Sequence, residues 1–194
     1  GAIGLHTACI SRDGRGLLAM GDSGAGKSTL VAACLLAGWD VIAEDSTFLL
    51  PAQIQARGVP TFVHLMQESM DMLAGSGLDR FVHAVVARRS GRRKYEIDVR
   101  RLRGQTLPVQ TRLCGIVFLA AEEAGSRPVQ PRARAIARSR IPALLRQYQP
   151  FAAEYSAWPA AVQSLAALPA ILLTSGRDLA ATVTALAHFL SKTT

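Results

Sequence analysis

The sequence predicts one α/β domain over residues 1–194, with a mixed sheet and flanking helices. Its 194 residues, 49% hydrophobic and 19% charged, are enough for a substantial core and unlike a disordered chain. Strand-like apolar runs and helix-forming segments follow one another in mixed order, which is typical of an α/β fold. The pair Asp13-Gly14 between two short apolar runs indicates a hairpin, so part of the sheet is expected to be antiparallel. The chain opens with Gly1 rather than Met, so the sequence leaves open whether a further region precedes it.

The expected elements follow from apolar runs and the residues that end them. A helix leaves the glycine-rich loop at 21–26 and stops at Gly38, a typical C-terminal cap. A strand that is interrupted by two acids ends at Pro51. Residues 51–61 are expected to form a loop, and 90–94 a basic turn. Helices are expected over 27–37, 68–73, 133–148, 160–168 and 178–190. Strands are expected over 5–10, 16–20, 39–50, 61–66, 95–99, 113–120 and 171–174.

The strongest motif is the segment 21–28, which satisfies the phosphate-loop pattern G-x-x-x-x-G-K-[ST] in full. Its glycines let backbone N–H groups approach phosphates, and the helix N-terminus adds its positive end. Lys27 is expected to reach the β- and γ-phosphates, and the Ser28 hydroxyl to hold Mg²⁺. We therefore predict a P-loop nucleotide-binding domain that uses ATP and Mg²⁺. The sequence does not distinguish ATP from GTP. The binding residues are expected to be Gly21, Asp22, Ser23, Gly24, Ala25, Gly26, Lys27, Ser28 and Thr29.

Two acids, Glu44 and Asp45, end an apolar strand only 17 residues after Lys27. A helix of about eleven residues and a short turn fill that gap, so the end of this strand is expected beside the phosphate loop. One carboxylate can help to hold Mg²⁺, and the other can accept a proton from an attacking hydroxyl. We predict Asp45 with Ser28 at the metal. Which of the two acids is the base stays open.

The segment 5–50 resembles the catalytic core of HPr kinase/phosphorylase and its relatives. A Leu-His pair ending in His6 precedes the loop, the loop itself matches, and Ile42-Ala43-Glu44-Asp45 falls where the family has Ile-Ala-Asp-Asp. The resemblance implies a fold akin to phosphoenolpyruvate carboxykinase and transfer of the γ-phosphoryl of ATP to a serine hydroxyl. It also implies that His6 lies near the phosphates, with Glu44 as base and Asp45 as its acidic neighbour. The catalytic set is then Glu44, Asp45, His6 and Lys27.

Later segments depart from the main family, since no glycine-rich Glu-Ile-Arg-Gly segment is recognisable. This departure argues against a regulator of sugar transport and against the reverse phosphorylase reaction. Shorter HPr-kinase-like proteins that accompany peptide natural-product genes, including lasso-peptide precursor kinases, are more similar, through 62–73 and 177–179. That resemblance implies a peptide or small-protein acceptor, such as a lasso-peptide precursor.

The net charge of +8 favours an acidic partner. The stretch 88–103 holds many arginines, which form either a solvated loop or a clamp for the triphosphate or an acidic acceptor. We expect an acceptor peptide or small protein that is acidic or carries a reactive serine. No membrane is expected, nucleic acid is disfavoured because aromatic residues do not alternate with the cations, and a homo-oligomer is left open.

The cysteines Cys9, Cys34 and Cys114 suit neither disulfides nor zinc, which indicates a reducing cytoplasm.

Two other functions stay open beside the ATP-dependent serine kinase. The apolar strand 115–119 is followed by Glu122 and Glu123, a pattern similar to that of motor and transporter ATPases, although the acids come two residues late. A P-loop ATPase that drives a partner would depend on those two acids. A nucleotide sensor would instead use the Arg-rich segment 88–103 to bind nucleic acid.

Overall fold

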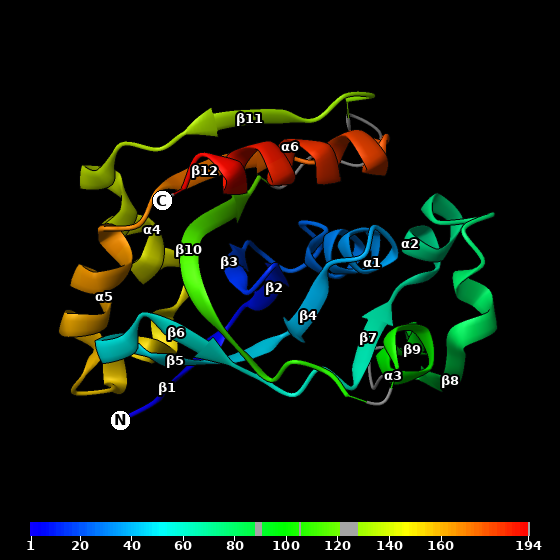
Figure 1. The fold of residues 1–194 in the computed structure, drawn as a ribbon, viewed down its shortest axis with the longest axis horizontal. Coiled ribbons are helices and arrows are strands. Elements are labelled where there is room, and N and C mark those ends of the chain that lie inside the picture. Colours follow the sequence, from blue (N-terminus) through cyan, green and yellow to red (C-terminus); the bar gives the residue numbers. More distant parts are fainter. Residues whose placement is uncertain (88–90, 105, 121–127, 194) are drawn as a thin grey trace.

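The structure, a computed structural model, describes residues 1–87, 91–104, 106–120 and 128–193, and it contains two sheets with helices around them (Figure 1). The large sheet has the order β1 (Ile3–His6), β5 (Ser46–Leu50), β6 (Gln55–Arg57), β10 (Gln110–Leu119), β3 (Arg15–Met20), β2 (Ala8–Arg12) and β4 (Asp40–Ala43). Two more strands extend it from β10, namely β12 (Ala170–Thr174) and then β11 (Arg132–Ala135). The small sheet has the order β7 (Phe62–Leu65), β9 (Arg93–Asp98) and β8 (Val82–Ala87).

Helices cover both faces of the large sheet. They are α1 (Lys27–Leu36), α4 (Ile141–Tyr148), α5 (Trp158–Ala166) and α6 (Leu179–Ser191), whereas α2 (Gln67–Met72) and α3 (Val99–Arg103) lie beside the small sheet. Short 3-10 turns lie at Pro51–Gln53, Leu78–Phe81, Arg138–Arg140 and Pro150–Glu154. In Figure 1, α1 and α6 lie on one side of the strands, α4 and α5 on the other, and the small sheet stands beyond α1.

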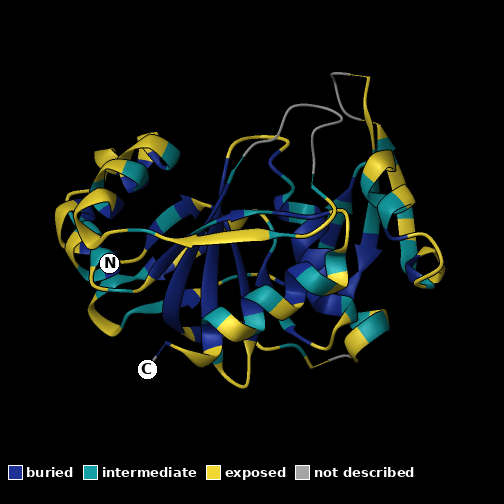
Figure 2. Ribbon diagram, turned by 90° about the horizontal axis from the view of Figure 1, so that it is seen from above, coloured by how far each residue is buried: buried dark blue, intermediate teal, exposed yellow. Residues whose placement is uncertain are grey.

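The core divides into two clusters because successive side chains of a strand point to opposite faces. In β3, Leu17 and Ala19 pack with α1 and α6, whereas Leu18 and Met20 pack with α4 and α5. The central strands β2, β3 and β10 are therefore buried on both faces, and Figure 2 shows them in dark blue between the helices. The sheet is mixed, because β10 runs parallel to β3 and β12 but antiparallel to β6.

The local predictions around the glycine-rich loop are confirmed. Strands β2 and β3 pair antiparallel through Asp13 (φ 53°) and Gly14 (φ 74°), two positive φ angles that suit a tight hairpin turn. Helix α1 follows Gly26 and ends before Gly38, whose φ of 88° favours glycine. The expected strand 5–10 is split at the buried Thr7, whose hydroxyl donates to the Ala19 carbonyl at 2.7 Å.

Other predictions are wrong in part. The expected helix 133–148 begins only at α4, because the alternating residues of β11 pair with β12 instead and Pro142 stands in the first turn of α4. The expected loop 51–61 contains β6, and β8 and α3 were not expected. The expected turn 90–94 places Arg93 and Lys94 in β9, while Ser90 lies outside the described residues. The expected strand 39–50 forms two strands with different neighbours, since β4 pairs with β2 and β5 pairs with β1 and β6.

Cys9, Cys34 and Cys114 are buried and unpaired with one another, as the sequence predicts. Burial raises the pKa of the Cys9 and Cys34 thiols. In the part of the chain that the structure describes, no helix is both long and apolar enough to cross a bilayer.

Gly58 fixes the end of β4, just before the two acids. A Cβ at this position would lie 2.2 Å from the Ile42 carbonyl oxygen and 2.6 Å from the Ala43 Cβ. Gly58→Ala should therefore lower the free energy of unfolding by about 1–3 kcal/mol, as measured in urea, because backbone atoms cannot yield as a flexible side chain does. Gly1→Ala, whose Cβ would meet nothing within 4 Å, is the control and should change nothing. Equal urea concentrations at the midpoint of unfolding for the two variants would contradict this packing.

Candidate functional site

The phosphate-loop segment connects the end of β3 to the first turn of α1. Gly24 and Gly26 have φ angles of 85° and 93°, a left-handed conformation that favours glycine. Gly21 has no room for a side chain, because a Cβ there would lie 3.0 Å from the Leu119 Cβ and 3.1 Å from the Ala25 Cβ. The glycines of the motif thus shape the turn, as the pattern requires.

Lys27 begins α1 directly after this turn and is almost fully buried. Its Nζ donates to the Gly21 carbonyl at 2.5 Å and to the Asp22 carbonyl at 3.1 Å. Burial lowers the pKa of Lys27, against the opposing effect of the carboxylates of Asp45, Asp22 and Glu44. The ammonium group is therefore held inside the loop, and the negative charges of nearby carboxylates act on it.

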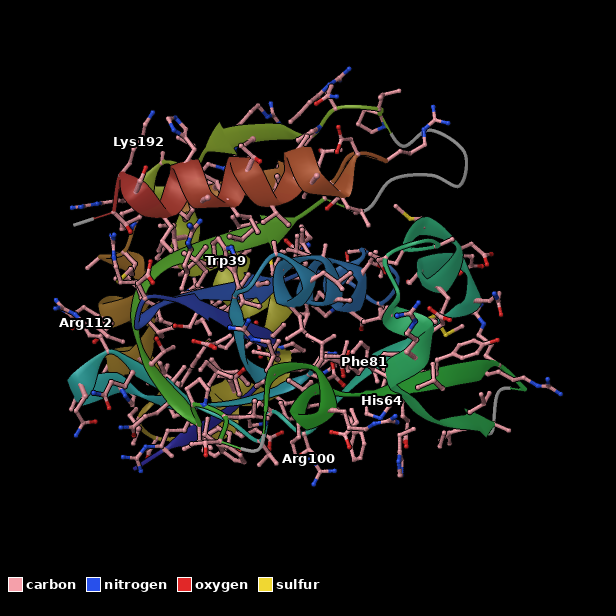
Figure 3. All side chains as sticks on the ribbon, turned by 45° about the vertical axis from the view of Figure 1, so that its right-hand side comes forward. Trp39, His64, Phe81, Arg100, Arg112 and Lys192 are labelled. Carbon is pink, nitrogen blue, oxygen red and sulfur yellow. The ribbon has the colours of Figure 1, made fainter. Side chains whose placement is uncertain are left out.

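Glu44 joins the loop to the small sheet through a chain of hydrogen bonds. Its Oε1 accepts a hydrogen bond from the Ser28 hydroxyl, and its Oε2 lies 3.2 Å from the His64 Nδ1. The His64 Nε2 lies 3.2 Å from the Glu96 Oε1 on β9. Figure 3 labels His64 on its strand, β7, on the side of the molecule that carries the small sheet. Four side chains from α1, the end of β4, β7 and β9 thus form one connected network.

The ionisation states follow from these contacts. Burial opposes the charge on Glu44, but hydrogen bonds from His64 and Ser28 and the charges of His64 and Lys94 outweigh it, so the pKa of Glu44 is lowered. The hydrogen bond to Glu44 raises the pKa of His64 against the cost of burial, and Glu96 adds to this effect. Glu44 is accordingly a carboxylate near neutral pH.

His6 and Asp45 form a second, more open pair. The His6 Nδ1 lies 3.4 Å from the Asp45 Oδ1, and the two side chains are 62% and 55% exposed. The backbone of His6 is fixed by Gln149, whose Oε1 accepts from the His6 N–H at 2.8 Å and whose Nε2 donates to the His6 carbonyl at 3.0 Å. A residue 143 positions away in the chain therefore holds this histidine at the end of β1.

A cavity of about 410 Å³ lies between the phosphate loop and the small sheet. Of the residues predicted for the site, those on its wall are His6, Ser23, Gly24, Gly26, Lys27, Ser28, Thr29, Glu44 and Asp45. Gly21, Asp22 and Ala25 are not on the wall and shape the turn behind it.

The opposite wall was not predicted from the sequence. It consists of residues from α2, from the small sheet and from the positions next to them, namely His64, Met66, Glu68, Ser69, Met72, Arg92 and Lys94. The Ser69 hydroxyl lies 2.7 Å from that of Thr29, so α2 is tied to α1. Arg92 and Lys94 belong to the basic stretch 88–103, for which the sequence left a clamp on the triphosphate or an acidic acceptor open, and the other residues of this wall fall within the segment 62–73 that carries the second resemblance. Arg88, Arg89, Glu122, Glu123 and Arg127 lie outside the described residues.

The strand carrying the acids is not the direct neighbour of the strand that enters the loop. Strand β2 lies between β4 and β3, whereas β10 runs parallel beside β3. Glu44 reaches the loop nevertheless, because it bonds to Ser28 in the first turn of α1.

The raised pKa of His64 gives stability a defined pH dependence. This contribution is fully present below the ordinary histidine pKa of about 6.5 and is lost as the pH rises through the folded-state value. The free energy of unfolding should therefore fall more steeply above pH 6.5 in the natural chain than in His64→Gln. His188→Gln, at an exposed position of α6, is the control and should keep the original slope. If the free energy of unfolding changed with pH in the same way in all three proteins, the raised pKa of His64 would be contradicted. An NMR titration of the His64 ring would measure that pKa directly.

Comparison with known proteins agrees with this architecture. A family described as SynChlorMet cassette protein ScmC matches residues 1–94. No curated protein matches the chain. Among solved structures, the HPr(Ser) kinase/phosphatase from Coxiella burnetii superposes with a TM-score of 0.51 over 97% of each chain, at 15% sequence identity. The resemblance expected from the sequence is thus confirmed at the level of the fold: the chain has a mixed α/β fold similar to that of HPr(Ser) kinase/phosphatase.

Proposed function

We propose that this chain is an ATP-dependent kinase that transfers the γ-phosphoryl group to a serine hydroxyl of a peptide or small protein, such as a lasso-peptide precursor. One observation carries the proposal: two adjacent carboxylates face the phosphate loop in different surroundings. Glu44 is buried against Ser28, whereas Asp45 is open to solvent beside His6. The similarity in fold to an HPr(Ser) kinase/phosphatase supports this function.

The three buried, unpaired cysteines suit a reducing compartment, and we propose the cytoplasm.

The donor atoms around Ser28 fit Mg²⁺. Its hydroxyl and a carboxylate of lowered pKa, that of Glu44, lie side by side at the start of α1. Protein sites for Mg²⁺ use one or two carboxylates and leave other positions to substrate phosphates and water. When bound there, Mg²⁺ would neutralise charge on the β- and γ-phosphates. These contacts support Glu44 beside Ser28 at the metal, whereas the sequence pattern favoured Asp45.

Asp45 is then the base. It is open to an incoming hydroxyl, and His6 beside it can stabilise the charge that Asp45 carries before the reaction. The serine oxygen attacks the γ-phosphorus, the bond from that phosphorus to the β,γ-bridging oxygen breaks, and the serine proton passes to Asp45. ADP leaves with the bonding electrons, while Lys27 and the loop amides stabilise the charge on its phosphates. Arg92 and Lys94 on the opposite wall are placed to hold a negatively charged group in the cavity.

A P-loop ATPase is the second candidate. It is supported by the position of β10, which is parallel to β3 and pairs Phe118 with Met20 at the loop end of the sheet. In that function Glu122 and Glu123, which follow this strand in the sequence, would act on the nucleotide. Glu122→Gln and Glu123→Gln distinguish the two candidates, because they should abolish hydrolysis by such an ATPase and leave a kinase based on Asp45 active.

The two acids should respond differently to removal of charge. Asp45→Asn should lower phosphoryl transfer about 10²–10⁴-fold with ATP binding retained, because the base is lost. Glu44→Gln should instead raise the Mg²⁺ concentration needed for half-maximal transfer about tenfold or more. Transfer is measured with γ-labelled ATP and a cell extract as the source of acceptor, and binding with a fluorescent ATP analogue.

Asp13→Asn is the matched control, since Asp13 lies in the exposed hairpin turn, far along the chain from the acids. It should retain full activity. Full transfer activity in both Glu44→Gln and Asp45→Asn would overturn the mechanism. If Glu44→Gln lost phosphoryl transfer and Asp45→Asn instead raised the Mg²⁺ concentration needed for half-maximal transfer, the roles of the two acids would be exchanged. The kinase function itself would stand.

A further inference from the structure

Strand β11 forms an exposed edge of the large sheet. It pairs with β12, and within the described ranges no other strand pairs with it. All four of its residues are exposed, and Figure 2 shows the strand in yellow, lying across the dark blue core. An edge of this kind presents backbone N–H and C=O groups to any extended chain that reaches it.

The hydrogen-bond pattern identifies which groups face outward. The Ile136 N–H donates to the Ala170 carbonyl at 2.9 Å, and the register pairs Arg134 with Leu172. Because hydrogen-bonded pairs alternate along an antiparallel ladder, Arg132 and Arg134 bond inward to β12. Ala133 and Ala135 therefore point their backbone N–H and C=O groups away from the sheet, where no described residue meets them.

The side chains on this edge select for negative charge. Arg132 and Arg134 stand on one face, two residues apart, and line a hollow of about 340 Å³ with Leu172 and Thr174. Neither arginine forms an ion pair with any residue that the structure describes. Arginine forks match carboxylates in bidentate fashion, so acidic side chains at alternate positions of an added strand would meet them.

The start of the edge is held in place by its neighbours. The Arg177 N–H donates to the Pro128 carbonyl at 2.8 Å, and the Asp178 N–H to the Val129 carbonyl at 3.0 Å. Gly176 packs so closely that a Cβ would lie 2.5 Å from the Val129 oxygen. The strand is therefore ordered before any partner arrives, which lowers the entropic cost of pairing.

The edge also points toward the proposed site of phosphoryl transfer. Strands β3, β10 and β12 are parallel, so their carboxyl ends and the phosphate loop share one border of the sheet. Because β11 is antiparallel to β12, its Arg132 end lies at that border. Four strand spacings of about 4.8 Å separate an added strand from β3, a span of about 19 Å that about six extended residues cover.

We propose that β11 docks an extended, acidic segment of the acceptor peptide as a further strand of the large sheet, with the acceptor serine beyond it. That this segment belongs to the acceptor rests on the proposed function, whereas the strand pairing does not. A second copy of the chain fits less well, because antiparallel pairing of two β11 strands would set arginine against arginine. Nucleic acid lacks the alternating amide donors and acceptors that the outward groups of Ala133 and Ala135 require.

The test measures binding without nucleotide, so it is independent of whether transfer occurs. The probe is a fluorescent peptide of about eight residues, end-blocked, which alternates glutamate with threonine so that one face is acidic. Fluorescence anisotropy should show binding that falls about tenfold or more in the double variant Arg132→Gln, Arg134→Gln. The double variant Arg138→Gln, Arg140→Gln removes the same charge from the neighbouring 3-10 turn and should retain binding.

Backbone pairing is tested on the peptide itself, which leaves the protein intact. N-methylation of one alternating set of peptide amides should abolish binding, and methylation of the other set should spare it, because only one set faces β11. Equal binding of the parent and of both methylated peptides would overturn the proposal, since charge alone would then explain it. Two further results would also overturn it: displacement of the probe by random single-stranded DNA at lower concentration, or a dimer in sedimentation that Ala133→Pro dissociates.

Discussion

The hydrogen bonds of Glu44 hold the two halves of the cavity together. A carboxylate buried to this degree would take up a proton unless its charge were compensated, and Ser28 and His64 provide that compensation. His64 is held in turn by Glu96, so the first turn of α1, the end of β4 and the small sheet meet at one charged group. Met66, Arg92 and Lys94 lie on the wall that this network joins to the phosphate loop, and the contact between Ser69 and Thr29 joins the same two sides. Removing one member would leave a charge without its partner, which costs more than the loss of a single hydrogen bond.

The C-terminal half of the chain positions the motifs of the N-terminal half. The family match covers 1–94 and includes the loop and both acids, yet one of the two strands that flank β3 is β10, and the residue that holds the His6 backbone is Gln149. Helix α6 packs with α1 in one core cluster, and α4 and α5 fill the other. The phosphate loop is therefore supported from both sides by residues that come after the matched segment. The fold likeness, in contrast, extends over 97% of the chain.

Features determined by short-range pattern could be predicted from the sequence. The hairpin at Asp13-Gly14, the glycine-rich turn and the acids after β4 each depend on residues close together in the chain. The pairing of His64 with Glu44 and Glu96 depends on strand register across two sheets, which composition and periodicity do not determine. The sequence predicts helix where β11 lies because arginine and alanine are good helix formers, and tertiary pairing with β12 prevails over that propensity.

The central claim is that the γ-phosphoryl group passes to a serine of a peptide or small protein, and following that group tests it most directly. The natural chain and Lys27→Ala would each be incubated with γ-labelled ATP, Mg²⁺ and an extract of the source cell, and the products separated into proteins, peptides and free phosphate. The account predicts label on a peptide or protein as phosphoserine, formed by the natural chain and not by Lys27→Ala. Label released by the natural chain only as free phosphate would contradict it and favour the ATPase.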